Sequence, residues 1–91
     1  MSHLDDTASP PALDELIAAL RTQLTTLAVA DPAAALRAAA QIESLGRRSA
    51  EQAAVTAYRR GASWSDIGVA FGISKQAAHQ RFARHVRAAQ R

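Results

Sequence analysis

The residues best suited to bind a charged ligand lie in the C-terminal half of the chain, where positive charge is concentrated. Residues 47–91 contain nine Lys or Arg and two acids, Glu51 and Asp66, which gives a net charge of +7. Residues 1–46 have a net charge of −4. A basic half beside an acidic half indicates a polyanion-binding module joined to a segment with a different task. The alternative is an ordinary solvated surface, and charge alone does not decide between the two.

The histidines of the basic half do not have the spacing of a metal site. His79 and His85 are six residues apart, which differs from the i, i+4 spacing of a helical zinc pair, and the chain has no Cys. No nucleophile stands with a base in an identifiable motif, and the sequence has no glycine-rich phosphate loop. We therefore expect no enzymatic activity, no metal and no cofactor.

The elements that position the basic residues are predicted to be helices. Of the 91 residues, 48% are hydrophobic, but 23 of the residues are alanine. Alanine is the best helix former and buries little area, so the chain should be helical with a thin core that a partner subunit could complete. The β-branched residues never alternate over a useful length, so the expected fold class is all-α.

The N-terminal part of the chain is expected to be a self-association segment. Residues 1–10 mix polar, acidic and turn-forming types and are predicted to be a disordered lead-in. A helical segment follows from 11 to 46, beginning at a proline, which the first turn of a helix tolerates. Six large aliphatic side chains lie on one face of its first helix: Leu13, Leu16, Ile17, Leu20, Leu24 and Leu27. This stripe either joins two subunits or packs on its own chain; we favour a homodimer, because the rest of the chain offers few large side chains to cover it.

A second helix is predicted to begin at Pro32, with Asp31 as its N-cap. Two outcomes compete at Gly46: a break at residues 46–49, where Ser49 could start a new helix, or one helix from 32 to 60 that tolerates the glycine at a cost of about 1 kcal/mol. We favour the continuous helix, because no proline intervenes. Gly61 is the expected stop.

Two short helices are predicted to follow within the segment 47–91. Ser63 can cap the first of them, with Asp66 at its third position and with Ile67, Ala70 and Phe71 on its inner side. Trp64 could stack on a ligand, but packing near Tyr58 is the favoured reading.

A tight turn and a second capped helix complete this stretch. Gly72 most readily takes the positive φ of a tight turn, and Gly68 has no side chain to obstruct a close helix crossing. Ser74 is the expected cap of the second helix, in which Ala78 and Phe82 point inward. A helix hairpin without any ligand is the alternative to a functional motif.

This stretch resembles the helix-turn-helix of sigma-factor region 4 and of small actinobacterial helix-turn-helix proteins. The resemblance covers about residues 57–86, a third of the chain, and no region-2-like segment precedes it. It is carried by small and apolar residues at fixed offsets: Ile67-Gly68, Gly72-Ile73-Ser74, Ala78 and Arg81-Phe82.

The resemblance implies that helix 74–87 is a recognition helix that enters the major groove of double-stranded DNA. With Ala78 and Phe82 inward, the expected base-reading residues are Lys75, Gln76, Ala77, His79 and Gln80. The expected phosphate contacts are Ser63, Ser65, Ser74, Arg81, Arg84 and Arg87.

The sequence therefore predicts a sequence-specific, dimeric transcriptional regulator in the cytoplasm, associated with the nucleoid. The alternative is a protein-interaction adaptor that docks on RNA polymerase, a sigma factor or another regulator, and the acidic, leucine-striped N-terminal half fits that role as well. No stretch approaches the roughly 18 apolar residues of a membrane span, so no membrane association is expected.

Overall fold

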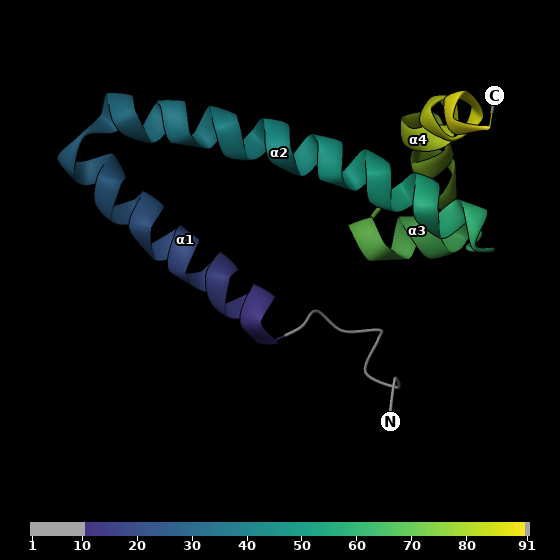
Figure 1. Cartoon of the computed structure of the whole chain (residues 1–91), viewed down its shortest axis with the longest axis horizontal. Helices are drawn as coiled ribbons and strands as arrows, with labels where there is room; N and C mark the ends of the chain where they lie inside the picture. The colour runs from purple at the N-terminus through teal and green to yellow at the C-terminus, as the bar shows by residue number, and fades with distance from the viewer. Residues whose placement is uncertain (1–10, 91) are drawn as a thin grey trace. The chain divides into compact units, whose positions relative to one another are not determined.

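The computed structural model describes residues 11–90, which form four helices and no strand (Figure 1). In chain order these are α1 (Pro11–Ala30), α2 (Pro32–Arg59), α3 (Trp64–Phe71) and α4 (Lys75–Ala89). The expected all-α class is confirmed for this part of the chain. The predicted disordered lead-in, residues 1–10, lies outside the described residues.

Helix α2 is continuous through Gly46, as favoured above, and the competing break at residues 46–49 is wrong. Asp31 caps it as expected, because the Ala34 amide donates to Asp31 Oδ1 at 3.1 Å. A side chain added at Gly46 would meet no atom within 4 Å, so this glycine serves no close contact. The high helix propensity of the residues around it explains why one glycine does not end the helix.

The described residues fall into two units, and α2 runs through both of them. We call residues 11–42 the N-terminal unit and residues 43–90 the C-terminal unit, since the division lies between Ile42 and Glu43.

The N-terminal unit has no buried residue. Its two helices join at Asp31, whose amide donates to the Leu27 carbonyl at 2.7 Å. Leu24 and Leu27, near this turn, are half-buried, whereas the leucines farther from it are exposed, with Leu16 at 67%. Most of the apolar stripe of α1 therefore has no cover within the unit.

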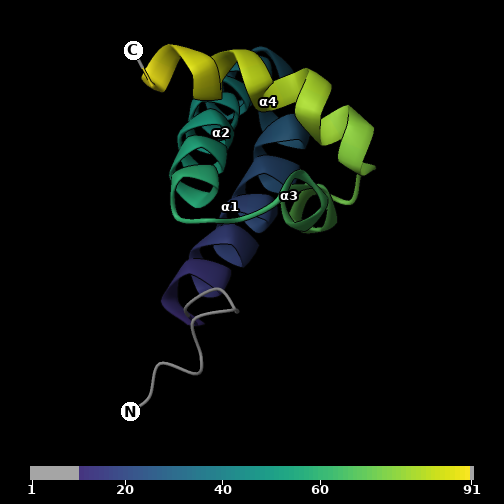
Figure 2. The ribbon, with the colours of Figure 1, turned by 90° about the vertical axis from the view of Figure 1, so that its right-hand side faces the viewer.

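The C-terminal unit holds the core, formed where the end of α2, α3 and α4 meet (Figure 2). Phe82 is completely buried among Ala54, Ile67 and Ala78, and Tyr58, Trp64 and Ile73 pack at its edge. Ala83 and Val86 extend the buried face of α4. Three of these six buried residues are alanines, which agrees with the expected thin core.

The turn between α3 and α4 has the expected form. Gly72 has φ 66° and ends α3, and its amide donates to the Val69 carbonyl at 3.1 Å. Gly68 is buried, and a Cβ at this position would lie 2.7 Å from the carbonyl oxygen of Ile73. Only glycine fits this contact, because the turn backbone passes directly over the helix. The predicted role of both glycines is confirmed.

One expectation for α3 is wrong. Ile67 is buried, but Ala70 and Phe71, which were also expected on the inner side, are exposed. Only Ile67 and Gly68, in the middle of this eight-residue helix, are buried, so the core contacts the middle of α3 rather than its last turn. Phe71 still contacts the core, because its ring centre lies 5.1 Å from that of Phe82, with the two rings tilted by 43°.

Candidate nucleic-acid interface

The first half of α4 presents a polar face to solvent and an apolar face to the core. Ser74 caps the helix as predicted, since its hydroxyl oxygen accepts from the Ala77 amide at 3.0 Å. Four of the five expected base-reading residues are exposed: Lys75, Gln76, His79 and Gln80. The fifth, Ala77, is half-buried, so only part of its methyl group is available for contact.

His79 is held in place by an aromatic cluster at the edge of the core. Trp64 is half-buried, its ring centre lies 4.8 Å from that of Tyr58, and the predicted packing of these two residues is confirmed. The other side of Trp64 meets the imidazole of His79 edge-on, with ring centres 5.1 Å apart and an interplanar angle of 80°. An edge-to-face contact of this kind favours one orientation of the imidazole beside Trp64.

The three arginines expected to contact phosphates, Arg81, Arg84 and Arg87, are all exposed. Arg81 differs from the others because its guanidinium carbon lies 5.2 Å from the Phe71 ring centre and 4.8 Å from that of Phe82. Such cation–π contacts fix the position of the side chain and keep its charge. The helix itself contains four Lys or Arg and no Asp or Glu, so it carries a net charge of +4.

The start of α3 is less suited to a phosphate than the sequence indicated. Ser63 and Asp66 form a reciprocal cap: the Asp66 amide donates to Ser63 Oγ at 3.0 Å, and the Ser63 amide donates to Asp66 Oδ2 at 2.9 Å. Hydrogen bonds to its carboxylate lower the pKa of Asp66; the one from the Ser63 backbone has the larger effect and the one from the Ser63 side chain the smaller. A carboxylate thus already occupies this helix terminus, which leaves the exposed Ser65 as the better donor of the two serines.

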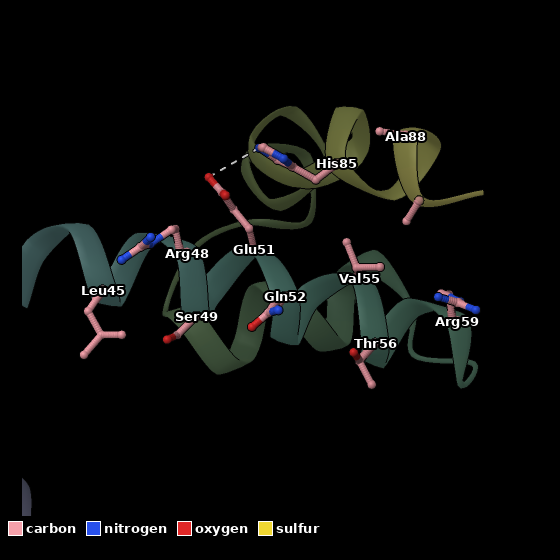
Figure 3. A pocket seen from close by; sticks show the side chains of 11 residues that line it. Leu45, Arg48, Ser49, Glu51, Gln52, Val55, Thr56, Arg59, His85 and Ala88 are labelled. Carbon is pink, nitrogen blue, oxygen red and sulfur yellow. Dashed lines mark ion pairs between the residues drawn. The ribbon is translucent and has the colours of Figure 1, made fainter. Parts of the chain in front are cut away.

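A contact between α2 and α4 was missed by sequence reasoning. His85 Nε2 lies 3.4 Å from Glu51 Oε2, and the pair bridges the two helices at one side of an open groove of about 860 Å³ (Figure 3). Arg48 and Arg59 line the same groove. The pair is separated by 34 positions in the sequence, so no local spacing could have indicated it.

The described residues contain no group of three or more His, Cys, Asp or Glu that could hold a metal ion. Within the same range, no helix is long and apolar enough to cross a membrane.

The exposed face of α4 offers amide and ammonium donors, an imidazole, amide acceptors and guanidinium groups, all from one helix. These groups match the edges of bases and the phosphates of a nucleic acid.

The chain is similar to mycobacterial proteins that are described as uncharacterized. The chain is 38% identical over 76 residues to an uncharacterized protein of Mycobacterium tuberculosis and, to the same degree, to one of Mycobacterium bovis. The matched segment covers 84% of this chain and 30% of each relative, so this chain spans less than a third of the length of the curated relatives it matches. No protein-family profile matches the chain. No solved structure matches it either.

Proposed function

We propose that the protein binds double-stranded DNA sequence-specifically and regulates transcription, with helix 74–87 in the major groove. The observation that carries the proposal is the two-sided character of α4. Its exposed side displays Lys75, Gln76, His79 and Gln80 without an acid on the helix, while Ala78 and Phe82 anchor the other side in the core. The resemblance to the helix-turn-helix of sigma-factor region 4 supports the same proposal.

Each exposed side chain has a distinct role in this proposal. Gln76 and Gln80 pair with adenine through their amide groups, and Lys75 reaches the acceptors of guanine. His79 is aimed by Trp64, and the half-buried Ala77 touches a thymine methyl. Arg84 and Arg87, together with Arg81, follow a phosphate strand, to which Ser63, Ser65 and Ser74 add hydroxyl groups.

The proposed protein is a homodimer, because one small module buries too little surface for tight specific binding. The exposed aliphatic stripe of α1 is the proposed interface, and Leu13, Leu16, Ile17 and Leu20 are each at least 41% exposed. A two-fold dimer predicts a palindromic site whose half-sites lie about 34 Å apart. The proposed role requires no catalysis and places the protein on the nucleoid in the cytoplasm.

An electrophoretic mobility shift with fragments of genomic DNA tests the proposal. We expect retarded complexes at low salt that persist for a subset of fragments when unlabelled competitor DNA is added. Absence of any complex at low salt would contradict DNA binding by this chain.

A second candidate function is that of an adaptor for RNA polymerase, a sigma factor or another regulator. It is favoured by the exposed leucine stripe, which is as suitable for another protein as for a second copy. Full-length protein carrying Leu16→Glu and Leu20→Glu distinguishes the two functions. Under the adaptor function these changes abolish capture of the partner, whereas under the proposed function they leave weak, monomeric DNA binding through α4.

A further inference from the structure

The exposed stripe of α1 has a more regular spacing than a simple apolar face requires. Leu13, Ile17, Leu20, Leu24 and Leu27 alternate steps of four and three residues, which is the heptad spacing of a two-helix coiled coil. The first three of these side chains are between 41% and 46% exposed. The heptad spacing also shows on which flank of the stripe each neighbouring residue lies.

We propose that α1 pairs with α1 of a second copy in an antiparallel arrangement, with Leu13 opposite Leu24 and Ile17 opposite Leu20. The inference rests on the homodimer of the proposed function and specifies its interface. Four apolar layers form in this register: the Leu13–Leu24 layer and the Ile17–Leu20 layer each occur twice, related by the two-fold axis.

Charge complementarity selects this arrangement over a parallel one. Asp14 and Arg21 are seven residues apart, so both lie on the same flank of the stripe. In an antiparallel pair each flank meets the same flank of the other helix, whereas in a parallel pair opposite flanks meet. The opposite flank carries Leu16 and Gln23, neither of which is charged, so a parallel pair gains no ion pair.

The same charges also select the register. In the register proposed, Asp14 of each copy lies beside Arg21 of the second copy, and these two ion pairs lie on either side of the two-fold axis. An antiparallel pair shifted by one heptad would bring the two arginines together with no aspartate within reach. The proposed register is therefore the one with four layers that places opposite charges together.

The shape of the N-terminal unit supports an antiparallel pair. Near the turn at Asp31, the unit has an apolar groove of about 500 Å³, lined by residues that include Leu24, Ala28 and Leu36. The exposed Leu13 lies at the other end of α1. Antiparallel pairing brings Leu13 of each copy to this groove of the second copy, whereas parallel pairing would place the two grooves side by side and leave both without a side chain to fill them.

Disulfide cross-linking of full-length variants tests the orientation, because the chain has no cysteine of its own. We expect a mixture of Leu13→Cys and Leu24→Cys to form a disulfide-linked dimer under mild oxidation, while each variant alone forms little. In the antiparallel pair, the two copies of Cys at position 13 are about 16 Å apart along the helix axis, which is too far for a disulfide. Efficient cross-linking of Leu13→Cys with itself would overturn the proposal in favour of a parallel pair.

Charge exchange tests the register with wild-type packing intact. Asp14→Arg and Arg21→Asp should each weaken the homodimer about tenfold in sedimentation equilibrium, because every flanking pair becomes repulsive. An equimolar mixture should recover wild-type affinity, since all pairs in the mixed dimer are attractive. Glu15→Arg is the matched control, because it makes the same charge change outside these flanks and should leave the dimer unchanged.

The outcomes separate this inference from the proposed function. A wild-type dimer without cross-linking between positions 13 and 24, or without recovery in the mixed dimer, overturns the antiparallel register and leaves DNA binding by α4 standing. A wild-type chain that remains monomeric overturns the register together with the proposed homodimer. DNA binding is measured separately by mobility shift in every case.

Discussion

Gly68 packs against the backbone of Ile73 so closely that a Cβ at position 68 would lie 2.7 Å from the Ile73 carbonyl oxygen and 3.0 Å from that of Ser74. These atoms belong to the turn that positions the start of α4. The placement of the proposed base-reading residues thus depends on a residue that has no side chain.

Replacing Gly68 by alanine should lower the free energy of unfolding by about 1–3 kcal/mol, since the turn backbone must move to admit the methyl group. Urea unfolding followed by circular dichroism measures the effect. Gly46→Ala is the matched control: its Cβ meets nothing within 4 Å, so the same substitution should stabilise α2 by about 0.5–1 kcal/mol. Equal effects of the two substitutions would contradict the close packing of α3 against the turn.

Asp66 should make stability depend on pH in the acidic range. Its pKa is below the ordinary value of 3.8 because the Ser63 backbone and side chain donate to the carboxylate. The depressed pKa means that the stabilisation is present above the unfolded-state value and is lost as the pH falls through the folded-state value. The free energy of unfolding should therefore fall more steeply below about pH 4 in wild type than in Asp66→Asn. Parallel pH profiles of the two proteins would show that the cap does not act through the charged carboxylate.

Arg84→Ala should weaken DNA binding to all sequences alike. Loss of one phosphate contact should reduce the slope of log K against log salt by about 0.9, which a titration at several salt concentrations measures. Arg81→Ala should do the same and also lower stability by about 0.5–1 kcal/mol, because its guanidinium packs on Phe71 and Phe82. A change in sequence preference in Arg84→Ala would instead assign this residue to base contacts.

Much of the local structure could be predicted because it depends on neighbouring residues. The caps at Asp31, Ser63 and Ser74 and the turn at Gly72 follow from hydrogen bonds and backbone angles within a few positions. The continuity of α2 through Gly46 could be favoured but not decided, because the two outcomes differ by only about 1 kcal/mol in helix propensity.

Contacts between distant residues could not be predicted in the same way. Spacing on a helix shows which residues share a face, but not how far a short helix turns that face toward its neighbours. The spacing predicts that Phe71 faces the core, yet it is exposed and its ring lies against the Arg81 guanidinium. The contacts of His79 with Trp64 and of His85 with Glu51 depend on the packing of three helices, which no local pattern records.

The central claim, that α4 reads bases, is tested most directly by comparing affinities for a selected and a scrambled duplex. The selected duplex is obtained by enrichment from a random library with wild-type protein, and binding is followed by fluorescence anisotropy at about 50 mM salt. Wild type should prefer the selected duplex, and Gln76→Ala should lose about 1–3 kcal/mol of that preference while keeping its affinity for the scrambled duplex. An unchanged preference in Gln76→Ala, or no binding of either duplex by wild type, would contradict the claim.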